Sequence, residues 1–225
     1  MNKIILFIFF VIIIYIFFHN SKDNDYSNKI AVVGNGPLTE KEIKKINNYE
    51  IIAVINDSRN SIKKNIKLNP TMLFLRQIQI NCDGFFGYDF NKNEFKNPDI
   101  MNTIKDIIFI SPEKKVCMKN INKIKKKYPK FNYKIISSGD EPWEKKPYKF
   151  NGKIYNLDKL PSSGITTIKY MLENYPKSEV HIYGMNWNAK SHTHNFKKEK
   201  EYINESKKCI IHKTWKNTYE PFKNK

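Results

Sequence analysis

Arginine and cysteine are both scarce in this sequence, and each shortage narrows the functions to consider. Of the 40 lysine and arginine residues, two are arginine, Arg59 and Arg76. Proteins that read DNA bases depend on the arginine fork, so the scarcity argues against base recognition. The three cysteines lie far apart and form no C-x-x-C pair. This argues against a zinc site or a disulfide framework, while one bridge with a leftover thiol stays open.

The rest of the composition indicates one folded, strongly basic domain with an appendage. Hydrophobic residues make up 40% of the 225 residues and aromatics 14%, enough to bury a core. The formal net charge of +18 favours anionic partners: nucleic acid, lipid headgroups or a charged small substrate.

The amino terminus carries the longest apolar run of the chain, residues 4–18. As a helix it would span about 22 Å, short of the hydrocarbon core, but Lys3 can reach the interface. Because no small-residue cleavage site follows Phe18, we expect an uncleaved signal anchor over 1–20 rather than a cleaved signal peptide. A polar stalk over 21–28 and a catalytic domain over 29–225 then follow, as a type II protein facing the ER or Golgi lumen.

The body alternates apolar runs with helical patterns. A capping box, Thr39-x-x-Glu42, predicts a helix start, and the lysine-rich stretch 113–127 predicts another helix. Such alternation is typical of an α/β fold with a Rossmann-like, mostly parallel sheet, whose ligands bind beyond the carboxyl ends of the strands. The turns to consider are therefore 34–38, 56–59 and 184–188. The predicted strands are 29–34, 50–55, 71–75, 106–110, 133–137 and 179–184.

Two of the candidate segments are turns that could approach a ligand. Gly34-Asn35-Gly36-Pro37 ends a strand, and Asn35 offers both a donor and an acceptor to a base or ribose. It is not the dinucleotide fingerprint, because the third glycine is missing. Ser162-Ser163-Gly164 opens a helix over 165–175, either as a phosphate seat or as simple capping.

The third segment is His192-Thr193-His194-Asn195, which precedes a helical pattern. A histidine in a loop that follows a sheet strand suits a general base, and the alternative is an exposed loop histidine. Metal binding by His192 and His194 is weakly indicated, since no Asp or Cys accompanies them at ligand spacing. The one Asp-x-Asp triplet, Asp23 to Asp25, lies in the stalk.

In this order the three segments resemble the motifs of the sialyltransferases, glycosyltransferase family 29, over roughly residues 29–215. IAVVGNGPL with AVIND is similar to the family's large motif. PSSGITTIKYML followed by VHIYGMNW is similar to its small motif, and His194 with Glu199 fits its very small motif. The resemblance implies a glycosyltransferase A-type variant of the Rossmann-like fold.

The resemblance also implies roles. His194 would be the catalytic base of an inverting transfer from CMP-sialic acid, without a metal or other cofactor. Glu199 follows His194 by five residues, about 140° around an ideal helix, so we expect it to be structural near the site, bonded to nearby backbone or a helix terminus rather than to His194. The acceptor would be a glycan on a glycoprotein or glycolipid, with the membrane as a further partner and no nucleic acid. The implied substrate-binding residues are Asn35, Gly36, Asn56, Ser162, Ser163, Gly164, Trp187 and His192.

The chain also departs from the family pattern. Val54 stands where the large motif usually carries arginine, and the family's cysteine pair and His-Tyr-Tyr motif have no counterpart. Two alternatives therefore stay open beside a CMP-sugar transferase. One is a same-fold glycosyltransferase that uses a different nucleotide sugar, and the other is a membrane-tethered polycationic protein that binds nucleic acid or acidic glycans.

Overall fold

A computed structural model describes most of the predicted catalytic domain. The predicted anchor over 1–20 and the stalk up to residue 27 lie outside the described residues. In the part of the chain that is described, no helix is long and apolar enough to cross a membrane. The described ranges are 28–56, 67–78, 84–111, 116–138, 148–150, 153–155, 159–187, 191 and 193–212.

The core element is a seven-stranded sheet in which every neighbouring pair of strands is parallel. This confirms the α/β, Rossmann-like class and the six predicted strands, and adds a seventh at one edge. The order across the sheet is β11-β10-β1-β2-β3-β6-β7. The strands are β1 (Lys29–Val33), β2 (Ile51–Ile55), β3 (Met72–Arg76), β6 (Asp106–Ser111), β7 (Asn132–Ser137), β10 (Glu179–Tyr183) and β11 (Cys209–Ile211).

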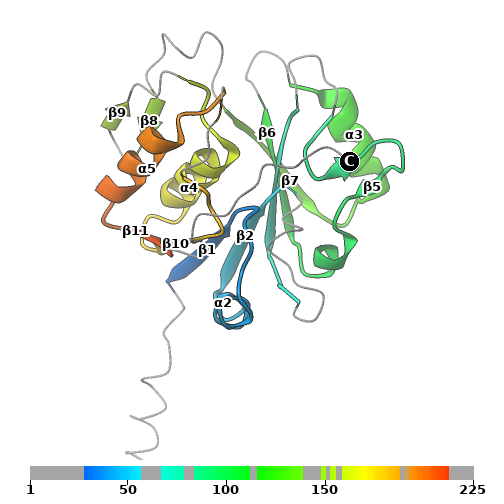
Figure 1. Cartoon of the computed structure of the whole chain (residues 1–225). Helices are drawn as coiled ribbons and strands as arrows, with labels where there is room; N and C mark the ends of the chain where they lie inside the picture. Colours follow the sequence, from blue (N-terminus) through cyan, green and yellow to red (C-terminus); the bar gives the residue numbers. More distant parts are fainter. Residues whose placement is uncertain are drawn as a thin grey trace, which may run out of the picture.

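The central strands are apolar on both faces because both faces of the sheet are covered. β1 (KIAVV) and β2 (IIAVI) are buried after their first residue, as expected for parallel strands between two helical layers. Figure 1 shows α4 (Ser163–Asn174) and α5 (Phe196–Glu205) together on one side and α3 (Met118–Lys127) on the other. The helices are α2 (Glu40–Ile46), α3 (Met118–Lys127), α4 (Ser163–Asn174) and α5 (Phe196–Glu205), with a 3-10 turn at Pro98–Asn102.

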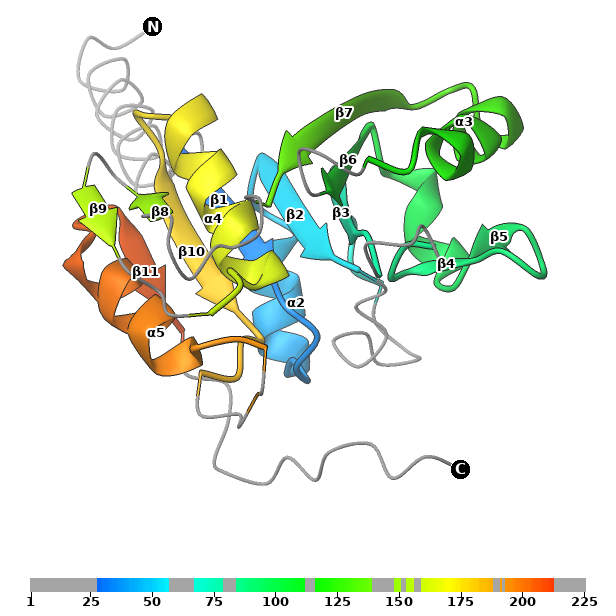
Figure 2. The same cartoon turned by 90° about the horizontal axis from the view of Figure 1, so that it is seen from above.

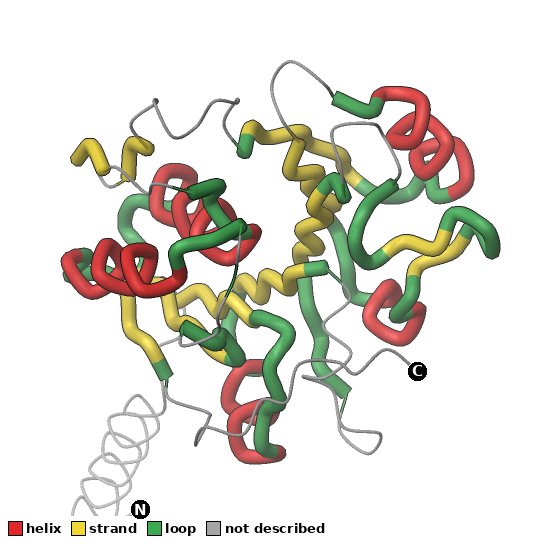
Figure 3. The backbone as a smooth tube through the Cα atoms, turned by 45° about the horizontal axis from the view of Figure 1, so that its top comes forward, coloured by secondary structure: helices red, strands yellow, loops and turns green. Residues whose placement is uncertain are grey.

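Two hydrophobic clusters hold these layers to the sheet. The first packs Ile43 of α2 and Ile121 of α3 against one face. The second packs Ile168 of α4 and Ile203 of α5 against the other. In Figure 3 the helices accordingly flank the row of strands on both sides. Two short hairpins complete the described chain, β4 (Tyr88–Asp89) with β5 (Glu94–Phe95) and β8 (Tyr148–Phe150) with β9 (Lys153–Tyr155).

The helix starts predicted from the sequence are present in the structure. Thr39 caps α2, its hydroxyl accepts from the Glu42 amide, and the Glu42 carboxylate accepts from the Thr39 amide, so the capping box is confirmed. α3 begins at Met118, within the predicted stretch 113–127, of which residues 113–115 are not described. Cys117 takes part in a disulfide bond and Cys209 is a free thiol, whereas Cys82 lies outside the described residues.

The order of the strands creates a switch point between β1 and β10. From β1 the chain progresses through β2, β3 and β6 to β7, and it then returns to the other side of β1 with β10 and β11. β10 and β1 lie side by side in Figure 2, with α4 and α5 together next to β10. In open parallel sheets, ligands bind outside the carboxyl ends of the strands at such a point.

Candidate active site

A cavity of about 550 Å³ opens at the switch point, within the size range of small-molecule sites. The turn after β1, the start of α4 and the loop that carries His194 all line it. Of the predicted residues, the cavity therefore gathers eight, and His192 lies outside the described residues. These eight are Asn35, Gly36, Asn56, Ser162, Ser163, Gly164, Trp187 and His194.

The turns that follow β1 and β10 are bonded to each other. The Gly34 amide donates to the Tyr183 carbonyl at 2.9 Å, and the Gly36 amide donates to the Gly184 carbonyl at 2.8 Å. A Cβ on Gly34 would lie 2.5 Å from the Gly184 oxygen, so the close approach requires glycine there. Gly184 itself has a φ of +60°, which glycine adopts at little cost. The side chain of Asn35 is left exposed at the cavity.

Asn56 ends β2 in a left-handed conformation, with a φ of 58°. Its Oδ1 accepts from the Arg76 amide at 3.2 Å, and its own amide donates to the Phe74 carbonyl at 2.7 Å. These bonds fix the end of β3 against the end of β2. The Asn56 side-chain nitrogen makes no hydrogen bond to any described residue, so it is available to a ligand in the cavity.

Ser162 caps α4, and its side chain is fully used by the protein. Its Oγ accepts from the Ile165 amide at 3.2 Å and donates to Glu199 Oε2 at 2.6 Å. Capping, one of the two interpretations of this segment, is thus the observed role of the Ser162 side chain. The amides of Ser163 and Gly164 have no partner among the described residues, and they lie at the positive end of the α4 dipole.

Glu199 of α5 is fully buried beneath this helix start. Besides the Ser162 hydroxyl, it binds the Ser162 amide through Oε1 at 2.8 Å. This confirms that Glu199 contacts backbone at a helix terminus. Burial raises the pKa of Glu199 to about 7, against the opposing effects of the Ser162 donors and of Arg76. The carboxyl therefore joins α5 to the start of α4.

His194 is oriented by a backbone carbonyl. Its Nδ1 lies 2.7 Å from the Leu160 oxygen, and because a carbonyl can only accept, Nδ1 must carry the proton. In the neutral ring, Nε2 then holds the lone pair, and it bonds to no described residue. Burial lowers the pKa of His194, which the Leu160 bond opposes and the charges of Arg76 and Lys159 reinforce. At neutral pH the imidazole is thus an unprotonated base.

Arg76 at the end of β3 is a functional residue that sequence reasoning missed. It is 8% exposed, lines the cavity and donates from Nη1 to the Pro161 carbonyl at 2.9 Å. Among the described lining residues, it is the one with a permanent charge. Its position at the carboxyl end of a strand was the available signal, because the same rule identified the turns at 34–38 and 56–59.

Three consecutive residues bind the three ionisable side chains of the site. Leu160 accepts from His194, Pro161 accepts from Arg76, and Ser162 donates to Glu199. The segment 160–162 therefore sets the positions of the imidazole, the guanidinium and the start of α4 relative to one another.

Trp187 also contributes to the site, and a metal ion there would need a group of side chains that could hold it. Trp187 is 8% exposed, lines the cavity, and its indole Nε1 has no partner in the described part of the chain. No group of three His, Cys, Asp or Glu side chains suited to hold a metal is found among the residues described here. The triplet from Asp23 to Asp25 falls outside them.

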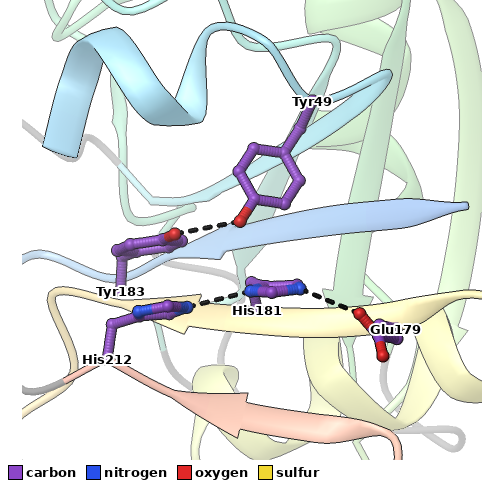
Figure 4. A network of polar contacts seen from close by, with 5 residues as sticks. All are labelled: Tyr49, Glu179, His181, Tyr183 and His212. Carbon is purple, nitrogen blue, oxygen red and sulfur yellow. Dashed lines mark hydrogen bonds and ion pairs between the residues drawn. The ribbon is translucent and has the colours of Figure 1, made fainter. Parts of the chain in front are cut away.

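A second polar cluster lies along β10 on the face of the sheet opposite α4 and α5. His181 Nδ1 and His212 Nε2 are 2.9 Å apart, and Glu179 Oε2 lies 3.4 Å from His181 Nε2. The hydroxyls of Tyr49 and Tyr183 are 3.0 Å apart, and the His212 ring stacks on Tyr183. Figure 4 shows this network along β10.

Comparisons with protein-family models, with curated proteins and with solved structures found no match to this chain. The geometry of the cavity therefore carries the functional argument.

Proposed function

We propose that this protein is a sialyltransferase-like glycosyltransferase that moves an acidic sugar from a CMP-activated donor to a glycan hydroxyl. One observation carries the proposal: the turn after β1, the free amides at the start of α4 and the unprotonated His194 all line the same cavity. In this reading the sheet is a glycosyltransferase A-type variant of the Rossmann-like fold.

The nucleotide of the donor would lie over the two turns, after β1 and after β10, that are hydrogen-bonded to each other. Asn35 and the free side-chain nitrogen of Asn56 suit the base and ribose, which present both acceptors and donors. The Ser163 and Gly164 amides suit the phosphate, because helix starts bind anions through free N–H groups and the dipole. Arg76 would add a positive charge for the sugar carboxylate or the phosphate.

Protein groups in the cavity can then assist both the attack by the acceptor and the departure of CMP. His194 Nε2 takes the proton of the acceptor hydroxyl while the hydroxyl oxygen forms a bond to the anomeric carbon. The bond from that carbon to the phosphate oxygen breaks, and CMP leaves with the electron pair. Attack from the face opposite the phosphate inverts the configuration. The α4 amides stabilise the charge that grows on the leaving phosphate.

The proposed setting is the lumen of the ER or Golgi, with the membrane reached through the predicted anchor over 1–20. A disulfide at Cys117 supports this setting, because such bonds persist in oxidising compartments.

The test combines nucleotide binding with donor turnover. CMP should raise the melting temperature more than UDP or GDP does, since a ligand bound only by the folded state stabilises it. Purified protein should hydrolyse or transfer from CMP-sialic acid. A His194→Asn variant, which can still donate to Leu160 but cannot take a proton, should bind CMP normally and lose at least about 100-fold in transfer. Normal transfer by this variant would rule out His194 as the base.

The alternative is a polycationic binding protein without chemistry. The observation in its favour is the α3–β7 region: residues 116–138 contain seven lysines and no acidic residue. It predicts binding to nucleic acid or acidic glycan whose logarithm falls linearly with log salt, with no turnover of any nucleotide sugar.

A further inference from the structure

A second cavity, of about 690 Å³, adjoins the first. The two share Trp187, His194 and Phe196 as lining residues, so these side chains form the partition between them. The imidazole of His194 therefore borders a nucleotide-sized cavity on one side and a separate space on the other. An acceptor molecule would have to occupy such a space for its hydroxyl to reach the base.

The second cavity differs from the first in its charge. Among the described residues, three lysines and one glutamate, Glu201, line the second cavity, whereas Arg76 alone is charged in the first. Lys197 and Lys200 make no hydrogen bond or ion pair with any described residue. They lie three residues apart on α5 and so share one face of that helix. Lys159 Nζ donates to the Ser191 carbonyl at 2.9 Å.

The remaining lining of the second cavity suits a saccharide. Trp187 and Phe196 offer aromatic surface against which the apolar face of a sugar ring can pack. Asn204 offers an amide that can donate to and accept from ring hydroxyls.

From this geometry we propose that the second cavity binds the acceptor, and that the acceptor is a saccharide carrying an anionic group, a carboxylate or a sulfate, held by Lys197 and Lys200. The proposal rests on the proposed transferase function, to which it adds the class of acceptor. The two lysines act as specificity-determining residues, and they take no part in the proton transfer by His194.

The test compares a neutral and an acidic saccharide of the same core. Lactose and 3′-sialyllactose are titrated into the full chain at low salt and their binding is measured by calorimetry or ligand-observed NMR. We expect 3′-sialyllactose to bind about tenfold more tightly, a preference of the size that two partly exposed charge pairs supply. The double variant Lys197→Gln/Lys200→Gln should lose that preference while its lactose binding stays the same.

Two further variants serve as controls. Lys197→Arg/Lys200→Arg keeps the charge and should keep the preference. Lys119→Gln/Lys126→Gln removes equal charge from the exposed face of α3 and should also keep it. Equal binding of both saccharides by the wild type, or an equal loss of preference in the α3 variant, would overturn the proposal. CMP binding is measured in parallel: its absence contradicts the proposed CMP-dependent transferase function, and the saccharide titration still decides the anion site.

Discussion

At the scale of single residues, the site is organised around the segment 160–162. Its two carbonyls and the Ser162 amide and hydroxyl bind His194, Arg76 and Glu199. The Glu199 carboxylate is not part of the described cavity lining and makes its hydrogen bonds to Ser162, so we regard it as a positioning residue. Its effect on a ligand would pass through the start of α4.

Glu199 gives the first prediction. Glu199→Ala should lower the free energy of unfolding by about 3 kcal/mol, because it leaves the buried Ser162 amide without its acceptor. Glu199→Gln should cost less, since its amide oxygen can still accept one of the two bonds. Urea unfolding at pH 7 measures both, and equal losses would show that the hydrogen bonds to Ser162 contribute little.

The Glu199 carboxyl also makes the free energy of unfolding depend on pH, and the sign of this dependence follows from its raised pKa. Its folded-state pKa of about 7 lies above its ordinary 4.5, so the folded state binds the proton more tightly. Stability from this group is present below pH 4.5 and is lost as the pH rises to 7, by about 3 kcal/mol in all. The stability difference between wild type and Glu199→Gln should therefore fall across that range, and a constant difference would contradict the raised pKa.

At the scale of elements, the turns after β1 and β10 form one interlocked unit. Gly34→Ala should cost about 2 kcal/mol or more and weaken CMP binding, because its Cβ would meet the backbone oxygen of Gly184, which cannot move freely. Gly164→Ala is the matched control for stability. Its Cβ would lie 3.2 Å from Met185 Sδ, which belongs to a flexible side chain. Urea unfolding that showed equal costs for both variants would contradict the interlocking.

Two histidines at the β10–β11 edge of the sheet, His181 and His212, give the stability a second pH dependence, opposite in sign to that of Glu199. Burial lowers the pKa of both His181 and His212, the latter to about 4. Because the unfolded chain binds these protons near 6.5, stability is lost as the pH falls from 6.5 towards 4. Two facing imidazoles 2.9 Å apart cannot both be charged. Charged groups of α2, Lys45 and Glu42, also face His212.

Hydrogen exchange at the edge of the sheet measures this effect. The Val180 and His212 amides donate across the β10–β11 pair, to Lys208 and Ile182. Their protection factors should fall roughly fivefold between pH 7 and pH 5, a value reduced for solvent screening at the partly exposed His212. His212→Phe keeps the stacking on Tyr183 and removes the titration of His212, so its protection should fall less than that of the wild type. Protection that falls equally in both proteins would exclude the histidine pair as the cause.

Elements with a local signal were predictable from the sequence, and non-local features were not. Continuous apolar runs identified β1 and β2, and the Thr39-x-x-Glu42 spacing identified α2. β11 was missed because three residues carry too little pattern, and its place depends on pairing with β10. Arg76 and the second cavity were missed for a related reason: each exists only because segments distant in sequence meet at the switch point.

At the scale of the whole molecule, the positive charge of the chain lies mostly outside the proposed donor cavity. The chain carries a formal net charge of +18, yet Arg76 is the one permanent charge among the described residues that line the proposed donor cavity. Most of the lysines would therefore act on an anionic donor at long range, through the potential around the protein. Long-range attraction is screened by salt, whereas contacts inside a cavity are screened much less.

This separation predicts different salt responses for a charged and a neutral ligand. CMP and cytidine share their base and ribose and differ in the phosphate. Between about 50 mM and about 500 mM salt, the affinity for CMP should fall roughly tenfold while the affinity for cytidine stays constant. Calorimetric titration measures both. A parallel fall for cytidine would mean that salt acts on the fold or on the cavity itself, and the surface lysines would then have no part in drawing the donor to its site.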